Sequence, residues 1–224
     1  MEDINNSIVS SFGETLISSG FDIATEYLEL ALDAVTDNET LREIPIVGSI
    51  IRVKNAVVSV RDRHLLKKTL EFVKQVNCGN IPEEKREEYR KKIIENDKNM
   101  KRELEHILLL IDNFVDGAKS KILAQFYLKY INGDSEWKDF CIFGEILDTI
   151  SIYDFDTLKY MYEIKYLHAN EVAEVNAISL FRLSSVGLIQ NLSGIQSSIN
   201  GEKNVIALIT DAGKTFYEVM CGII

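Results

Sequence analysis

The chain has 224 residues, of which 46% are hydrophobic and 27% are charged, and this usage excludes an intrinsically disordered chain. The formal net charge is −10 at pH 7, and the length suits one large domain or two small ones. The only prolines are Pro45 and Pro82, so the helix-forming residues are rarely interrupted and the composition predicts a mainly α-helical protein.

The cysteines exclude two further classes of protein. Cys78, Cys141 and Cys221 are far apart and belong to no Cys-x-x-Cys or Cys/His cluster, so neither a disulfide framework nor a zinc site is expected. The first twenty residues are acidic and lack the basic start of a secretory signal. We therefore expect a cytoplasmic protein.

The charge is distributed unevenly along the chain. Residues 1–43 contain ten acidic residues and one basic residue, whereas residues 44–82 contain seven basic residues and two acidic ones. The favoured interpretation is that the acidic segment folds back and neutralises the basic one, and the alternative is a free basic surface that binds a ligand.

Hydrophobic periodicity predicts helices in the first part of the chain. Apolar residues recur at intervals of three to four between residues 8 and 35, which is typical of one or two amphipathic helices. Pro45 stands near a helix start, where its missing N–H matters least, and the pattern then continues to Val76. A single basic amphipathic helix is therefore expected within residues 44–82.

Local signals divide the middle of the chain. Pro82 followed by two glutamates predicts a helix start, with a solvated first half and a core-facing second half that ends at Gly117 as C-cap. Further helices are predicted after Gly117 and from Trp137, separated by a turn at residues 132–135. Asp154 is expected to cap the next helix, over residues 157–166.

The last part of the chain changes character. A helix that ends near Gly187 leads into a short strand, a loop rich in serine and asparagine follows, and a second strand leads into a helix begun at Thr210 or Asp211. Helix, strand, loop, strand, helix is the outline of a winged-helix unit. The predicted architecture is a helical bundle over residues 1–150 with a small winged-helix-like subdomain over residues 151–224.

Two family resemblances add to this outline. The segment "LFRLSSVGLI...NVIALITDAGKTF" resembles the end of bacterial winged-helix domains, and the matching positions are Leu183, Gly187, Leu188, Ile189, Ile209, Thr210 and Gly213. The stretches "IPIVGSIIRVKNAVVSVRDRHLLKKTLEFV", "ELEHILLLIDNFVDGAKSKILAQFYLKYINGD" and "FGEILDTISIYDFDTL" resemble uncharacterised bacterial helical proteins associated with prophages and phage-defence loci. The second resemblance implies an accessory or effector role and supplies no chemistry.

The basic segment carries the main candidate site. Its apolar positions are Ile46, Val47, Ile50, Ile51, Val57, Val58 and Leu65, and the candidate residues for binding a partner or lipid are Arg52, Lys54, Arg61, Arg63, Lys67 and Lys68. Arg52 interrupts the apolar run well before the roughly 20 residues that span a membrane. Three interpretations stay open: a core helix facing residues 1–43, which is favoured, a surface for an acidic protein partner, and an interfacial helix on an anionic membrane.

Nucleic-acid binding is disfavoured by the charges near the proposed winged helix. A DNA reader presents lysine and arginine on its recognition helix and wing. The helix here contains only Arg182 and the wing only Lys203, and residues 151–224 are net negative. A winged-helix-like unit that binds a protein is the favoured interpretation.

Catalytic and metal-binding residues are not predicted. The three histidines fall in separate segments, and no recognised nucleotide-binding, metalloprotease or hydrolase motif occurs. Asp112 with Asp116, and Asp154 with Asp156, could each ligate Mg²⁺, but helix capping explains both pairs more simply. We expect a protein without a cofactor that is not an enzyme.

These features favour a non-enzymatic interaction or regulatory protein with a protein partner, and the resemblance suggests a component of bacterial phage defence. The alternative is a membrane-surface-binding or membrane-disrupting effector, peripheral at the inner face of the membrane. A winged-helix transcription regulator is the third interpretation, and self-association through an exposed helix stripe stays open.

Overall fold

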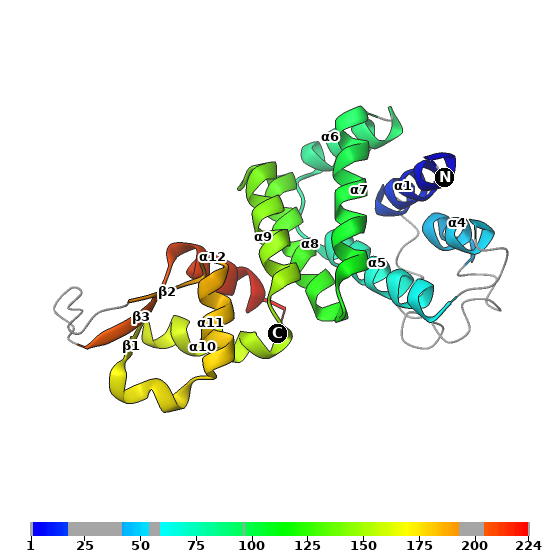
Figure 1. The fold of residues 1–224 in the computed structure, drawn as a ribbon. Coiled ribbons are helices and arrows are strands. Elements are labelled where there is room, and N and C mark those ends of the chain that lie inside the picture. The colour runs from blue at the N-terminus through cyan, green and yellow to red at the C-terminus, as the bar shows by residue number, and fades with distance from the viewer. Residues whose placement is uncertain (1, 18–41, 54–58, 96, 193–203, 224) are drawn as a thin grey trace. The chain divides into compact units, whose positions relative to one another are not determined.

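The computed structural model describes residues 2–17, 42–53, 59–95, 97–192 and 204–223 (Figure 1). Most of these residues lie in helices, and three short strands form one antiparallel sheet, so the prediction of a mainly α-helical protein is confirmed. The chain divides into two compact units, residues 1–140 (unit 1) and residues 141–224 (unit 2). This division falls inside helix α9 (Trp137–Thr149), before the boundary at residue 150 that the sequence suggested.

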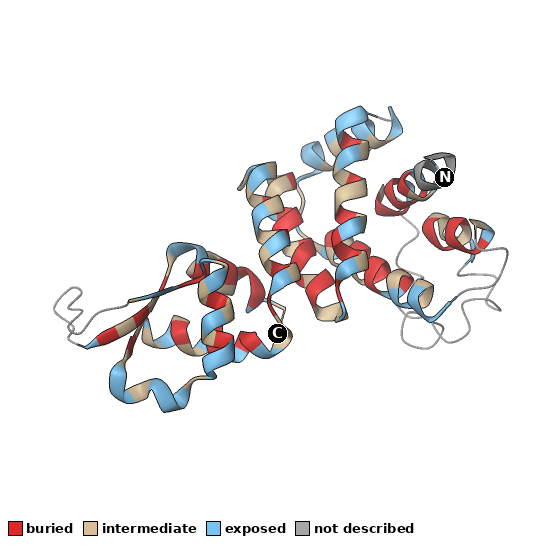
Figure 2. Cartoon of the chain, viewed as in Figure 1, coloured by how far each residue is buried: buried red, intermediate tan, exposed pale blue. Residues whose placement is uncertain are grey.

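Unit 1 is built from helices that bury their apolar sides against one another. Besides the start of α9, its described helices are α1 (Glu2–Ile17), α4 (Pro45–Val53), α5 (Val60–Cys78), α6 (Glu83–Ile94), α7 (Lys98–Asn113) and α8 (Gly117–Asn132). Helix α5 packs along α8, and α1 packs on α4 and α7. Figure 2 shows the buried residues on the sides of these helices that face each other. Of the helices predicted over residues 8–35, α1 accounts for the part up to Ile17, and the rest lies outside the described residues.

A chain of aromatic rings forms the centre of unit 1. Phe12 from α1 contacts Phe72 from α5, Phe72 contacts Tyr127 from α8, and Tyr127 contacts Phe140 from α9, with ring centroids 6.0, 5.6 and 5.4 Å apart in that order. All four side chains are almost completely buried. The acidic N-terminal helix is therefore part of the core, because Phe12 belongs to the same cluster as the rings of the central helices.

The prediction of a single helix from Pro45 to Val76 is wrong. Helix α4 ends at Val53, and α5 begins at Val60. Ser59 defines the second start: its hydroxyl accepts a hydrogen bond from the Asp62 N–H at 3.1 Å, and the Asp62 carboxylate accepts one from the Ser59 N–H at 3.0 Å. This reciprocal capping box begins a new helix, although the apolar periodicity continues past it.

The prediction of one helix from Glu83 to a C-cap at Gly117 is also wrong. Helix α6 ends at Ile94, and α7 begins at Lys98 with Asp97 as its N-cap. Helix α7 ends at Asn113, and Gly117 is the first residue of α8. Asp116 caps that helix by accepting a hydrogen bond from the Ala118 N–H at 2.8 Å. The predicted turn after α8 is confirmed, and Gly133 closes the helix with φ of +81°, a conformation that glycine adopts without strain.

Unit 2 combines short helices with the sheet. Its elements after α9 are η1 (Ile152–Asp154), α10 (Phe155–Ile164), β1 (Tyr166–His168), η2 (Ala169–Glu174), α11 (Ala177–Ser185), β2 (Ile189–Asn191), β3 (Val205–Ile209) and α12 (Asp211–Met220). The strand order is β1-β3-β2 and both pairs are antiparallel, with Leu167 opposite Ala207 and Ile189 opposite Ile209. The predicted order of helix, strand, loop, strand and helix is thus present, with the loop itself outside the described residues.

The start of α12 agrees with the sequence pattern. The Thr210 hydroxyl accepts a hydrogen bond from the Gly213 N–H at 3.0 Å and so caps the helix. A Cβ atom on Gly213 would overlap the Leu188 carbonyl and lie 2.8 Å from Ile209 Cγ1. Glycine therefore lets α12 approach the backbone before β2.

Candidate functional site

The basic residues predicted to bind a partner or lipid have different environments. Lys54 lies outside the described residues. Arg52 is exposed and donates from Nε to the Gly48 carbonyl of its own helix at 3.1 Å. Lys67 is exposed, and Arg63 is half-buried. Their role in binding stays a prediction.

Arg61 and Lys68 form hydrogen bonds with residues at the C-terminal end of helix α7. The exposed Arg61 guanidinium donates from Nη2 to Asp112 Oδ2 at 2.5 Å. Lys68 is only 5% exposed, and its Nζ donates to the carbonyls of Asp112 at 3.0 Å and Phe114 at 2.5 Å. Burial lowers the pKa of Lys68, but both carbonyls lie at the negative end of the helix dipole and stabilise a cation. Lys68 therefore joins α5 to α7 and is not available to a surface ligand.

The apolar face of α4 is covered within unit 1. Its residues Ile46, Val47, Ile50 and Ile51 are buried, and α1 packs against them. The Ile46 N–H donates to the Thr15 hydroxyl at 3.1 Å, and the hydroxyls of Ser11 and Ser49 are hydrogen-bonded at 2.5 Å. The described part of residues 1–43 thus covers the apolar face of α4, whereas the expected neutralisation of the basic residues by the acidic segment stays a prediction. In the part of the chain that the structure describes, no helix has the length and apolar character needed to cross a bilayer.

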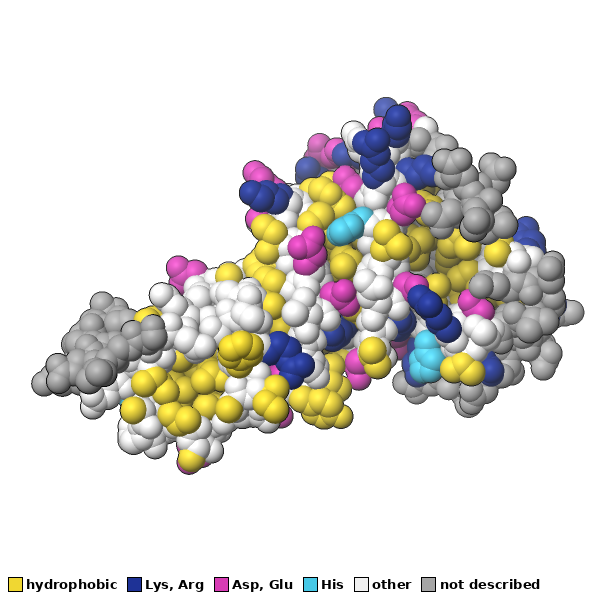
Figure 3. Space-filling view, in the orientation of Figure 1, with side chains coloured by type: hydrophobic (Ala, Val, Ile, Leu, Met, Phe, Trp, Pro, Cys, Tyr) yellow, Lys and Arg dark blue, Asp and Glu magenta, His cyan; other side chains and the backbone are white. Residues whose placement is uncertain are grey.

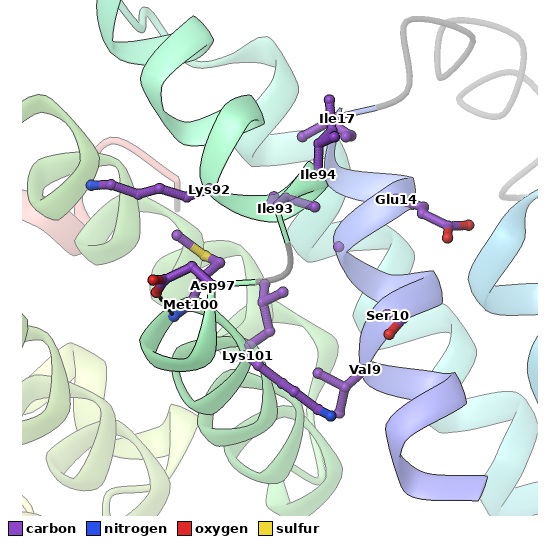
Figure 4. A pocket seen from close by; sticks show the side chains of 12 residues that line it. Val9, Ser10, Glu14, Ile17, Lys92, Ile93, Ile94, Asp97, Met100 and Lys101 are labelled. Carbon is purple, nitrogen blue, oxygen red and sulfur yellow. Dashed lines mark hydrogen bonds between the residues drawn. The ribbon is translucent and has the colours of Figure 1, made fainter. Parts of the chain in front are cut away.

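A cavity of about 340 Å³ lies between α1 and the α6–α7 pair (Figure 4). Its lining is largely apolar, with Gly13 allowing the close approach of Leu104 and Ile93. Two of the polar groups in its lining have structural partners: Lys92 pairs with Glu88 at 2.9 Å, and Asp97 accepts hydrogen bonds from the start of α7. None of the described lining residues is a histidine or a cysteine. The cavity could hold a small apolar molecule by its size but presents no convergent reactive groups.

The aspartates considered as magnesium ligands have other partners. Asp112 pairs with Arg61, and Asp116 caps α8. Asp154 is fully buried, and its carboxylate accepts a hydrogen bond from the Ser151 N–H at 2.7 Å, so it completes the capping box in which Ser151 is the N-cap of η1. Its side chain makes no capping hydrogen bond to α10, contrary to the prediction. Among the residues described, no three histidine, cysteine, aspartate or glutamate side chains come close enough to hold a metal ion.

Arg182, the only basic residue of α11, pairs with a buried aspartate of unit 2. Its Nε lies 2.9 Å from Asp154 Oδ2, and the arginine side chain is 36% exposed. This ion pair connects α11 to η1, which are in contact. Arg182 is therefore committed to the fold, and α11 has no other cation to offer a phosphate group.

The outward face of α11 is apolar and uncharged. Ser179 and Leu183 are buried on its inner side, whereas Ile178 and Phe181 are 70% and 73% exposed. Ala177 is also exposed, and we call Ala177, Ile178 and Phe181 the α11 patch. Figure 3 shows hydrophobic side chains gathered on unit 2 around this helix.

Exposed apolar residues also occur on other elements of unit 2. Tyr153 of η1, against which α11 packs, is 80% exposed, and Val172 of η2 is 43% exposed. Large exposed apolar side chains on one face of a helix, as Ile178 and Phe181 are, are typical of protein-binding surfaces. The patch was not predicted from the sequence, although the apolar residues on both sides of α11 were a signal that one side lacks a partner within the unit.

The chain matches no protein-family model, and no curated protein or solved structure shows significant similarity to it.

Proposed function

We propose that this chain is a non-enzymatic interaction protein that binds a partner protein on the α11 patch. The observation that carries the proposal is that α11 exposes Ile178 and Phe181 to solvent while its only cation, Arg182, is paired inside unit 2. Burying two such side chains against a partner would contribute about 1.5–3 kcal/mol each before the costs of association. The resemblance to phage-defence proteins makes a role in such a system part of the proposal.

The arrangement of unit 2 supports a winged-helix-like subdomain that has this binding role. A helix (α10), a strand (β1), a helical segment (η2 and α11) and a two-stranded hairpin (β2 and β3) follow one another, with β3 between β1 and β2. In a DNA-binding winged helix, the helix before the hairpin enters the major groove and carries lysine and arginine. Here α11 occupies that place with an apolar face, which favours a protein partner over DNA.

A second candidate function rests on the exposed cations of unit 1. Arg52, Arg61 and Lys67 are accessible and could attract an acidic protein or an anionic membrane. The apolar residues that would enter a membrane from α4 are packed on α1, so this function requires α4 to separate from its neighbour. Flotation with anionic vesicles at low and high salt, using the wild type and the Arg61→Glu/Lys67→Glu variant, tests it.

The main proposal is tested by quantitative recovery of proteins from native lysate. Phe181→Asp should remove the recovered partner, because a charge would be buried at the contact. Leu109→Asp is the matched control, since Leu109 is 60% exposed on α7 of unit 1 and its substitution should leave recovery unchanged.

Two results would contradict the proposal. One is a partner recovered equally by the wild type and Phe181→Asp. The other is retardation of duplex DNA at low salt by the wild type, because the third candidate function, transcription regulation, predicts it. Circular dichroism of Phe181→Asp should match that of the wild type, since the side chain is 73% exposed and has little role in packing.

A further inference from the structure

The surface of unit 2 is acidic. Its described residues, 141–192 and 204–223, contain nine aspartates and glutamates but four lysines and arginines, and of the nine acidic residues only Asp154 is buried. Two of those cations are paired within the unit, Arg182 with Asp154 at 2.9 Å and Lys214 with Asp211 at 2.8 Å. A ligand that approaches this surface therefore meets an excess of negative charge.

Two of these acidic residues precede the α11 patch by a few positions in the sequence. Glu171 and Glu174 belong to η2, which leads into α11 through the Asn176 cap. Glu174 is exposed, and Glu171 is half-buried and accepts a hydrogen bond from the His168 N–H at 3.1 Å. Partial burial and then these two carboxylates raise the pKa of Tyr160, so their field extends to α10.

We infer that the segment bound on the α11 patch is an amphipathic helix whose apolar face is bordered by lysine or arginine. This inference rests on the proposed function and adds the chemical class of the partner. The apolar side chains of the helix would pack on Ile178 and Phe181, with Tyr153 as a further aromatic contact, and its cations would face Glu171 and Glu174. Aromatic anchors with a complementary charged border are the usual composition of a specific protein contact.

Other occupants fit these charges poorly. A second copy packed patch to patch around a twofold axis would bring the carboxylates of both copies together. Helix α5 of a second copy has the right charge, but its apolar residues Leu66, Leu70 and Val73 are buried in unit 1. Nucleic acid and anionic lipid would be repelled, because their phosphates are negatively charged like Glu171 and Glu174. Charge complementarity therefore favours a basic apolar partner over each of these.

The test uses the full chain and two synthetic helical peptides with the same leucine face, one with lysine and one with glutamate at all other positions. Fluorescence anisotropy should show binding of the leucine–lysine peptide, weakened by salt, and no binding of the leucine–glutamate peptide. Phe181→Asp should weaken binding of the first peptide by at least about 30-fold, the effect expected for an interface anchor.

Substitution of Glu174 distinguishes the contribution of the acidic residues from that of the α11 patch. Glu174→Lys should weaken binding of the leucine–lysine peptide and lower its salt dependence. Glu84→Lys, at an exposed position of α6 in unit 1, is the matched control and should have no effect. Leu109→Asp again controls for loss of an exposed apolar side chain.

Each contrary outcome has a distinct meaning. Equal binding of both peptides, abolished by Phe181→Asp, would overturn the basic class of partner while the patch remained a docking surface. Failure of the leucine–lysine peptide to bind, or binding insensitive to Phe181→Asp, would overturn the inference, whereas the lysate experiment would still decide the proposed function. A dimer detected by light scattering and lost in Phe181→Asp would identify a second copy as the occupant and overturn the inference as well.

Discussion

Breaking the ion pair between Arg182 and Asp154 measures how much Arg182 contributes to the stability of the protein. In Arg182→Ala the fully buried Asp154 carboxylate keeps its hydrogen bond from the Ser151 N–H but loses its cation. Loss of one partner costs about 3–5 kcal/mol for a buried pair and about 0–1 kcal/mol for an exposed pair. Because Asp154 is buried and Arg182 is 36% exposed, we expect an intermediate loss, about 2–3 kcal/mol.

The partner variant extends this to a double-mutant cycle. Asp154→Ala removes both the ion pair and the Asp154 half of the capping box at the start of η1, and the loss of a cap adds about 1 kcal/mol. The double variant should cost about 2 kcal/mol less than the sum of the single variants, because each single variant already removes the same contact. Urea unfolding followed by circular dichroism supplies the free energies. The Tm of Arg182→Ala should fall by about 5–10 °C for a chain of this size.

The control is Lys159→Ala, which removes an exposed cation from α10 and should change stability by less than about 0.5 kcal/mol. The structural role of Arg182 would be refuted if Arg182→Ala were no more destabilising than this control. Additivity of the two single variants within about 0.5 kcal/mol would refute it too.

Three further predictions concern packing and charge. Lys68→Met should destabilise the protein by about 2 kcal/mol in urea unfolding, because the carbonyls at the end of α7 lose their donor, whereas exposed Lys67→Met should change stability by less than about 0.5 kcal/mol. Gly213→Ala should lower the free energy of unfolding by at least about 2 kcal/mol, because its Cβ would overlap a backbone carbonyl. Gly117→Ala should be neutral or stabilising, because an added Cβ there would meet no neighbouring atom within 4 Å. Equal effects of the two substitutions would contradict this packing. Burial raises the pKa of Glu103 above 4.5, so ionisation opposes folding and stability should fall as pH rises through that higher pKa. Glu103→Gln should therefore raise the Tm relative to the wild type at neutral pH but not in acid, and a constant difference in differential scanning fluorimetry at both pH values would exclude the effect.

The binding surface proposed from the structure, the α11 patch, is not the one that the sequence suggested, which was the basic segment within residues 44–82. The basic segment attracts attention because its charges lie close together in the chain. In the structure Lys68 is buried, and Arg61 is paired with Asp112. The α11 patch is less conspicuous, because Ile178 and Phe181 look like ordinary core residues of an apolar helix until their neighbours are known.

Local chemistry made much of the fold predictable. Helix starts at Glu83 and Asp211 and the turn at Gly133 depend on a few consecutive residues, so their sequence signals were sufficient. The predicted continuous helix from Pro45 failed because apolar periodicity reports which side of a helix is buried and does not register a break. The Ser59–Asp62 capping box was the local signal that marked that break.

The sequence by itself determined that this protein is mainly helical, where several described helices begin, and that two strands follow α11, since these depend on neighbouring residues. Only the tertiary structure decided which side chains remain accessible. Lys67 and Lys68 are adjacent in the chain, yet one is exposed and the other joins two helices; Arg182 pairs with Asp154 from a different element, while Phe181 beside it faces solvent. Burial and ion pairing depend on segments far apart in sequence, and no local pattern encodes which of them meet.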